Sequence, residues 1–291
     1  MSSPNNTLGF VLMSVTSFVF AAQDAISLHL AAEFNVFMIV MVRFWTFALF
    51  ALILAHRNGG IRQNFQSNRP AVQWFRSILL PLEICVTVAA FTYLGLTESH
   101  AIFVCYPLII VALSGPILGE KIGWIRWSAV LIGFVGVLII VRPGFGVVSP
   151  WAMLPLLGAA MFALYGVTTR IAGLHDSATT SFLYIGVIGA MVMTIVGAFH
   201  WQMLAQPDVL WMIVLCLTGI FGHWLLIKTY EVAEASAVQP FAYLQMPFAA
   251  GFGVLIYTET VRLNVAIGAA IIVTAGLFVF WRERQVAQKQ P

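Results

Sequence analysis

Charged side chains are scarce in this sequence, and their scarcity excludes most soluble protein classes. Lysine, arginine, aspartate and glutamate together make up only 9% of the 291 residues, whereas soluble domains carry about 25%. Hydrophobic residues make up 61%, and the mean hydropathy is +0.95. A soluble core could not bury so much apolar surface, so these side chains must face lipid or one another. The composition therefore predicts an integral membrane protein.

Cysteine is also scarce, and the sequence lacks any block of basic residues. The three cysteines, Cys85, Cys105 and Cys216, lie inside apolar runs without the spacing of metal ligands, so we expect them to pack as small side chains. The net charge is only +3, which gives no support to nucleic-acid binding. We therefore predict no metal site and no nucleic-acid partner.

Motifs of pumps and enzymes are absent as well. The chain has no Gly-x4-Gly-Lys-Ser/Thr phosphate loop, no His-Glu-x-x-His and no Gly-x-Ser-x-Gly. Its three aspartates, Asp24, Asp176 and Asp208, are isolated from one another in the sequence. These absences argue against a primary pump and against an intramembrane enzyme, and we expect neither catalysis nor a cofactor.

What the sequence does contain is a series of long apolar runs. A helix of about 20 residues crosses about 30 Å of hydrocarbon, and runs of that length occur ten times. They use almost the whole chain, so we predict an all-α membrane protein with short connections and no soluble domain. The predicted spans are Leu8–Leu28, Val36–Ala55, Ala71–Leu94, Ala101–Leu118, Ile122–Val141, Trp151–Arg170, Thr180–Phe199, Val209–Thr229, Ser236–Tyr257 and Leu263–Trp281.

The distribution of lysine and arginine predicts which side each connection faces. With the N-terminus in the cytoplasm, ten of these residues fall on the inner side and only two, Arg142 and Arg262, on the outer side. The positive-inside rule then places both termini in the cytoplasm. No basic segment precedes the first apolar run, so we interpret it as a retained span and not as a signal peptide.

A proline-containing apolar helix, followed by a glutamate and a glycine-bearing helix, occurs twice. Pro107 precedes Glu120 by thirteen positions, and Pro247 precedes Glu259 by twelve. This self-similarity predicts two five-helix repeats within one transmembrane domain. Because five is an odd number, the second repeat enters the membrane from the opposite side, and such inverted repeats surround the central cavity of many secondary transporters. We place the repeats at residues 1–143 and 144–291.

Three stretches carry a family resemblance. They are the intramembrane Arg43 in VRF, the stretch YPLIIVALSGPILGE that closes the fourth span, and the glycine-bearing helix that ends in Arg-Pro. Together with the 5+5 spans they resemble the drug/metabolite transporter superfamily, in particular its EamA-type exporters, and are similar to bacterial aromatic amino-acid exporters. The resemblance implies a basket of helices whose cavity is lined chiefly by spans one, three, four, six, eight and nine. The second copy departs from the pattern, because Tyr257-Thr258-Glu259 replaces Gly-Glu.

Ionisable residues inside the predicted spans are costly in a bilayer and therefore mark partners or a transport pathway. Asp24 and Arg43 lie at similar depths, each roughly 10 Å from the outer end of its span. We predict a structural ion pair between them, with contact to substrate as the alternative. Glu83 lies near the middle of the third span, where it either lines the cavity or is a satisfied structural carboxylate. A protonatable glutamate there would also suit proton coupling.

Prolines within spans indicate where the binding site lies. Proline frees a backbone carbonyl and weakens a helix, so we expect helix breaks at Pro107 and Pro247, beside the site. Aromatic, amide and hydroxyl groups near these breaks would suit a small zwitterion with an apolar or aromatic side chain. For each of them, ordinary packing between helices is the alternative. The predicted substrate-binding residues are Gln23, Glu83, Tyr106, Tyr165, His223, Trp224, Tyr243 and Gln245.

Two further groups of residues have ordinary structural explanations. Glu120 closes the fourth span beside Lys121, where helix capping and charge pairing are expected. The histidines outside the candidate site fall at predicted helix ends or loops, where a solvated imidazole is expected. These are His29, His56, His100, His175 and His200.

The predicted function is a secondary transporter that exports small organic solutes, most of all amino acids including aromatic ones, by alternating access. We expect it in the lipid bilayer of a bacterial cytoplasmic membrane as a monomer, with a dimer as the alternative. The scarcity of cationic groups in the spans disfavours a phosphate-bearing cargo, and a nucleotide sugar or a purine is kept as the alternative substrate. An intramembrane enzyme and an accessory or receptor-like protein are the competing classes, although neither needs inverted repeats.

Overall fold

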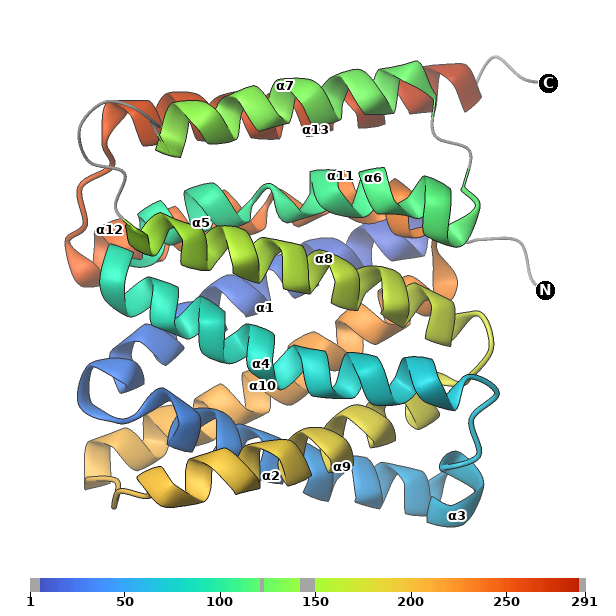
Figure 1. Cartoon of the computed structure of the whole chain (residues 1–291), viewed down its shortest axis with the longest axis vertical. Coiled ribbons are helices and arrows are strands. Elements are labelled where there is room, and N and C mark those ends of the chain that lie inside the picture. The colour runs from blue at the N-terminus through green and yellow to red at the C-terminus, as the bar shows by residue number, and fades with distance from the viewer. Residues whose placement is uncertain (1–5, 121–122, 142–149, 288–291) are drawn as a thin grey trace.

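The computed structural model describes residues 6–120, 123–141 and 150–287. Throughout these residues the chain is helical and contains no β-strand (Figure 1), so the prediction of an all-α fold is confirmed. The helices are α1 (Asn6–Glu33), α2 (Val36–Arg57), α3 (Ile61–Asn64), α4 (Pro70–Leu94), α5 (Leu96–Phe103), α6 (Tyr106–Leu118), α7 (Trp124–Val141), α8 (Met153–Gly173), α9 (Ala178–Gly197), α10 (Gln206–Val232), α11 (Ala235–Ala242), α12 (Gln245–Tyr257) and α13 (Leu263–Ala287), with short 3-10 helices at Pro150–Ala152 and Ala198–His200.

Eight helical segments of the described chain are long and apolar enough to cross a membrane. They correspond to predicted spans one to four and six to nine. The fifth and tenth predicted spans coincide with α7 and α13, whose apolar stretches are shorter, Leu131–Ile140 and Leu263–Ala275. Each of the ten predicted spans is therefore helical, and the longer loop between the second and third contains only the four-residue helix α3.

The fourth and ninth spans are each broken into two helices of matching length. Helices α5 and α11 have eight residues each, and α6 and α12 have thirteen residues each. Pro107 and Pro247 lie in the first turns of α6 and α12, where a missing N–H group and a fixed φ angle are tolerated. In a continuous helix each proline ring would clash with the carbonyl four residues earlier, so one helix ends and another begins.

The far ends of the two broken spans also match in backbone conformation. Gly119 follows α6 with a φ of 70°, and Thr258 follows α12 with a φ of 53°. A left-handed conformation costs an L-residue about 1 kcal/mol, so tertiary contacts must hold Thr258 in place. The next residue supplies them, because the Glu259 carboxylate accepts hydrogen bonds from the backbone N–H groups of Leu96 at 2.6 Å and Thr97 at 2.8 Å. The glutamate of the second copy therefore caps the start of α5.

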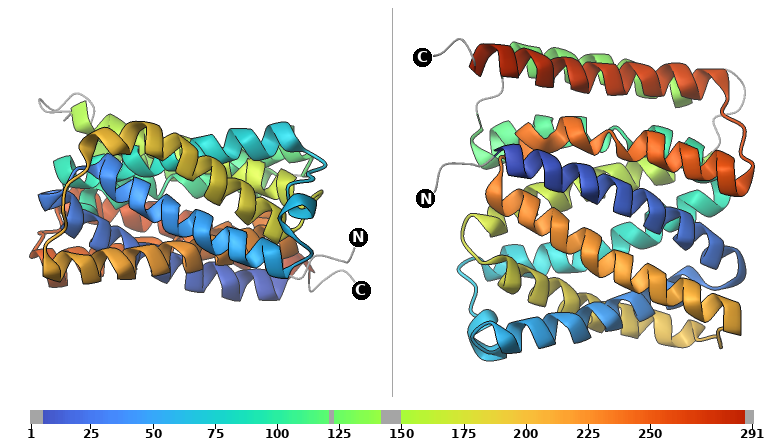
Figure 2. Two further views of the ribbon diagram at one scale, coloured as in Figure 1. Left: turned by 90° about the horizontal axis from the view of Figure 1, so that it is seen from below. Right: turned by 180° about the vertical axis from the view of Figure 1, so that it is seen from behind.

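Each long helix of the first half packs against a helix of the second half. The pairs are α1 with α10, α2 with α9, α4 with α8 and α7 with α13, and further views of the bundle are given in Figure 2. The two broken spans run antiparallel, because α5 packs against α12 and α6 against α11. This is the pairing that a twofold relation between two inverted five-helix units produces. The predicted boundary between residues 143 and 144 lies outside the described residues.

The start of α1 and the end of α13 lie at the same end of the molecule (Figure 1). We call this the terminal end; it also carries α3 and the start of α11. The opposite end carries the connection from α4 to α5 and the end of α12. An even number of spans requires that both termini lie on one side. That this side faces the cytoplasm stays a prediction, and Arg142, one of the two expected outer cations, lies outside the described residues.

Candidate functional site

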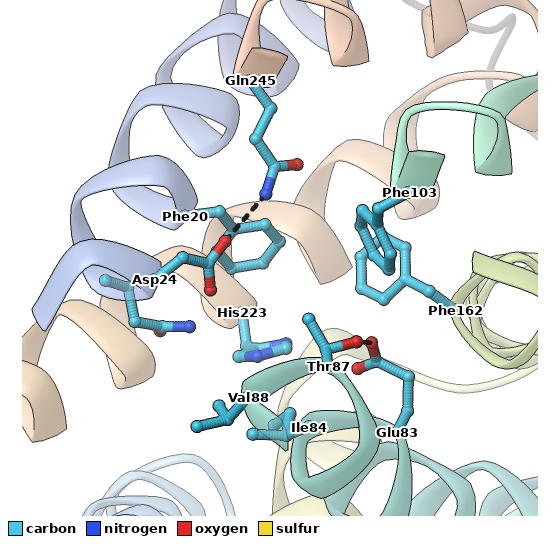
Figure 3. Close-up of a pocket in the computed structure, with 11 residues that line it drawn as sticks. Phe20, Asp24, Glu83, Ile84, Thr87, Val88, Phe103, Phe162, His223 and Gln245 are labelled. Carbon is cyan, nitrogen blue, oxygen red and sulfur yellow. Dashed lines mark hydrogen bonds between the residues drawn. The ribbon is translucent and has the colours of Figure 1, made fainter. Parts of the chain in front are cut away.

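A cavity lies between six helices in the middle of the bundle (Figure 3). Its walls come from α1, α4, α5, α8, α10 and α12, which are the six spans that the family resemblance implied. Carboxylates, amides and aromatic rings share the lining. The lining residues are Phe20, Gln23, Asp24, Glu83, Ile84, Thr87, Val88, Phe103, Phe162, His223 and Gln245.

Asp24 lies on α1 and is held by residues of both broken spans. Its Oδ2 accepts a hydrogen bond of 3.1 Å from Nε2 of Gln245, the first residue of α12. The same oxygen lies 3.2 Å from Nε2 of His100, within ion-pair distance but without hydrogen-bond geometry. The predicted ion pair between Asp24 and Arg43 is not formed: no salt bridge within the described chain joins the two. The reason is geometric, since α5 begins earlier than expected and brings an imidazole to the carboxylate.

His100 corrects the prediction of a solvated imidazole. It is 1% exposed and stacks on Phe91 with a centroid distance of 5.2 Å. Sequence reasoning started the fourth span at Ala101, whereas α5 starts at Leu96. The signal was present, because a glycine followed within three residues by Glu98 is typical of a helix N-terminus. It would have placed His100 one turn inside the helix.

Glu83 forms the second acidic group of the cavity. Its Oε1 accepts a hydrogen bond of 2.6 Å from Thr87, one turn further along α4, and the side chain is almost fully buried. Within the described residues no lysine or arginine lies at ion-pair distance from it. A buried carboxylate without a cation is costly in a membrane, so this group needs either a proton or a positively charged partner.

Aromatic rings form the opposite wall. Phe162 on α8 lies 5.7 Å from Phe103 and 6.2 Å from Phe20, centroid to centroid. The His223 ring lies 4.9 Å from Phe20. Sequence reasoning missed the three phenylalanines, because an aromatic residue in an apolar helix gives no signal that separates cavity from lipid. Figure 3 shows Phe103 and Phe162 side by side, facing Glu83 and Thr87 across the cavity.

Of the eight predicted binding residues, the structure gathers four in the lining: Gln23, Glu83, His223 and Gln245. Tyr106 and Tyr165 lie behind it, each in ring contact with Phe162. Trp224 and Tyr243 are not part of the described lining; Trp224 instead packs on Phe182 and carries the Lys228 ammonium 5.4 Å above its ring.

Several buried polar atoms around the cavity have no hydrogen-bond partner within the described chain. A buried unsatisfied polar group costs about 1–3 kcal/mol, so a concentration of them indicates groups that await a ligand. They are Gln23 Oε1, Arg43 Nε and Nη2, Tyr165 OH, His223 Nδ1 and Gln245 Oε1. Among the described residues no group of three metal-ligating side chains lies together. The lining therefore offers carboxyl groups, hydrogen-bonding groups and aromatic rings.

Comparisons with known proteins agree with this architecture. A model of the EamA-like transporter family matches residues 7–142 and, a second time, residues 149–281. An S-adenosylmethionine uptake transporter of Rickettsia prowazekii is 25% identical to the chain and covers 97% of it and 94% of that protein. A riboflavin transporter of Vibrio cholerae is also 25% identical, with coverage of 97% and 96%. A protein of known crystal structure, 14% identical, has the same fold with a TM-score of 0.71 over 97% of this chain and 98% of its own.

Proposed function

We propose a substrate class for this protein from the premise that the chain belongs to the EamA-like transporter family and is a membrane transporter. The substrate is a small organic cation or zwitterion that carries an aromatic ring system, and S-adenosylmethionine is the leading compound. The single observation that carries the proposal is that two carboxyl groups, the partly buried Asp24 and the buried Glu83, share one cavity lining with several aromatic rings.

Charge decides between the candidate substrates. S-adenosylmethionine carries an ammonium and a sulfonium against one carboxylate, so its net charge of about +1 would offset one of the two acidic charges, and its adenine can stack on phenylalanine. Riboflavin is uncharged and would use the rings but not the carboxylates. A nucleotide sugar is anionic and would be repelled. The names of the relatives point to S-adenosylmethionine and riboflavin. Aromatic amino acids, the substrate expected from the sequence, are the second candidate because their ammonium group could contact the carboxylates.

The transport step follows from the two broken spans. Helix breaks at the midplane give a substrate partners on either half, and rocking of one repeat against the other opens the cavity to each side in turn. Gln245 at the start of α12 and Asp24 on α1 form such a contact across the cavity. We propose that the gradient sets the direction of net movement, so that the same protein supports uptake or export in a bacterial cytoplasmic membrane. We further propose that the terminal end faces the cytoplasm and that one chain suffices.

The test is transport by the purified protein in proteoliposomes. Radiolabelled S-adenosylmethionine, phenylalanine, riboflavin and a nucleotide sugar are compared, with and without a pH gradient, in both directions. We expect S-adenosylmethionine to move fastest and the nucleotide sugar not at all. Transport of riboflavin without S-adenosylmethionine would overturn the assignment.

Matched variants connect transport to the two carboxylates. Asp24→Asn and Glu83→Gln should each lower S-adenosylmethionine transport by about 10-fold or more, because a charge-assisted contact is worth about 1.5–3 kcal/mol. Asp208→Asn is the control, since this carboxylate lies in the first turn of α10, 3.7 Å from His29 and away from the cavity. Equal transport by all three variants would remove the acidic pair from the site.

A further inference from the structure

We propose that Arg43 recognises the carboxylate of the substrate and thereby makes the transporter selective for amino-acid-type compounds over amines. This inference rests on the proposed function, because it assigns a binding partner to the carboxylate of the proposed substrate. Arg43 becomes a specificity-determining residue and not the structural partner of Asp24.

The first observation is that Arg43 is buried without a partner. It lies on α2, is 1% exposed, and its Nε and Nη2 groups have no hydrogen-bond acceptor in the described part of the chain. The other intramembrane arginine provides the contrast. Arg76 is equally buried, yet it donates to Gln73 Oε1, Thr169 Oγ1 and the Ser181 carbonyl at 2.6–3.0 Å. Packing of this bundle can satisfy a guanidinium, and at Arg43 it does not.

The second observation is a small space that joins Arg43 to the cavity wall. A side-chain carbon on Gly219 of α10 would lie 3.3 Å from Gln23 Oε1, 3.4 Å from the Phe47 ring and 3.6 Å from Arg43 Nη2. The two polar atoms therefore border one point that the missing glycine side chain leaves open. Gln23 lines the cavity, and its Oε1 also lacks a partner within the described residues. Arg43 thus lies one side chain behind the wall, and rotation of the Gln23 amide gives the guanidinium access to a ligand.

The charges around Arg43 complete the arrangement. Cys216, Asp24 and Glu83 lie within electrostatic range of its guanidinium, although neither carboxylate forms an ion pair with it in the described chain. A guanidinium beside two carboxylates matches a zwitterionic head, whose carboxylate and ammonium are separated by only one carbon atom. Arginine presents a planar set of N–H donors that suits a carboxylate bidentately. The substrate would supply the acceptors that Nε and Nη2 lack.

The experiment crosses a protein change with a ligand change. Transport into proteoliposomes is measured for S-adenosylmethionine and for the same compound without its carboxylate, with wild-type protein and with Arg43→Gln. For wild type we expect a preference of about 10-fold or more for the carboxylate form, the value typical of one charge-assisted contact. Arg43→Gln should lose that preference by slowing the carboxylate form while the amine form stays within about twofold.

A second pair of variants keeps the test decisive if Arg43→Gln does not fold. Gly219→Ala fills the space beside Nη2 and should lower the preference for the carboxylate form. Gly251→Ala on α12 is the matched control, because its added carbon meets no atom within 4 Å, and it should transport as wild type does.

The outcomes separate this inference from the proposed function. Equal transport of both compounds by wild type overturns the role of Arg43 and leaves the substrate class intact. Equal loss of both compounds in Arg43→Gln, with the preference unchanged in Gly219→Ala, also overturns it and assigns Arg43 to helix packing. If wild type moves neither compound, the proposed function fails and this inference fails with it.

Discussion

The two ends of the molecule hold the halves together with different chemistry. At the opposite end, one carboxylate does so: Glu259 of the second half caps α5 of the first half through two backbone N–H groups. At the terminal end, Glu120 stands at the equivalent position after a left-handed residue, yet its Oε2 has no hydrogen-bond partner in the described chain. Both repeats therefore have a left-handed residue followed by a glutamate, but the capping contact of Glu259 has no counterpart at Glu120 among the described residues.

The terminal end is joined instead by a network of side chains. Asp176, in the connection between α8 and α9, accepts hydrogen bonds from Ser67, from the backbone and side chain of Asn68, and from Gln73. Gln73 in turn accepts from Arg76. This network ties α4 and the loop before it to the second half.

The comparison shows that the two repeats share features set by neighbouring residues and differ in side-chain contacts between distant segments. Helix lengths and the breaks depend on residues within one turn, and they recur in both halves. The contacts between halves depend on side chains from distant segments, and they differ. Each end can therefore be perturbed without the other.

The largest expected effect comes from the glycine that makes room for the cap. A side-chain carbon on Gly253 would lie 2.6 Å from Glu259 Oε2 and closer still to Thr97 Oγ1, so Gly253→Ala displaces the carboxylate. We expect a loss of about 3 kcal/mol, the upper range for overpacking. Gly251→Ala, two residues earlier on the same helix, should be neutral or stabilising. Thermal unfolding of both variants in detergent measures the difference, and equal midpoints would contradict it.

The next effect tests the two glutamates against each other. Glu259→Ala leaves the N–H groups of Leu96 and Thr97 without an acceptor and should cost about 2 kcal/mol. Glu120→Ala should cost less than half of that, because it removes an oxygen that has no partner. The same unfolding assay compares the two variants. A larger loss of stability in Glu120→Ala than in Glu259→Ala would contradict the prediction.

Acid should weaken the terminal end selectively. Burial alone would raise the pKa of Asp176, but the hydrogen bonds from Ser67, Gln73 and Asn68 outweigh it and hold this pKa below its usual value of 3.8. A depressed folded-state pKa contributes stability above the unfolded value, and this contribution is lost as the pH falls through the folded one. We expect the midpoint temperature of unfolding to fall as the pH is lowered below about 4. This fall should be smaller in Asp176→Asn. A Glu259→Gln variant with the same pH profile as Asp176→Asn would contradict the assignment.

The smallest effect concerns the two left-handed residues. Thr258→Gly should stabilise the protein by about 1 kcal/mol, because glycine adopts a positive φ without strain. Gly119→Thr should destabilise it by a similar amount. The opposite signs are the prediction, and two changes of the same sign would mean that tertiary contacts, not backbone strain, dominate at these positions.

Much of the fold could be predicted from the sequence because its signals are local. Composition placed the chain in a membrane, and the ten spans and the breaks near Pro107 and Pro247 followed from run length and from the geometry of proline. The candidate site was predicted in part. Gln23, Glu83, His223 and Gln245 meet in one cavity. They could be predicted because polar side chains stand out within apolar helices. Phe103 and Phe162 could not be found in that way, since lipid-facing rings look the same.

The sequence by itself determined the membrane fold, the duplication and the interrupted spans, because hydropathy and backbone restriction act within a few residues. Only the tertiary structure decided that Asp24 contacts His100 and Gln245 and that Nε and Nη2 of Arg43 meet no acceptor among the described residues. Because α5 starts at Leu96 and not at Ala101, His100 lies inside the helix and not in the loop before it. Side-chain partnership is therefore set by the rotation and packing of whole helices, which no short stretch of sequence records.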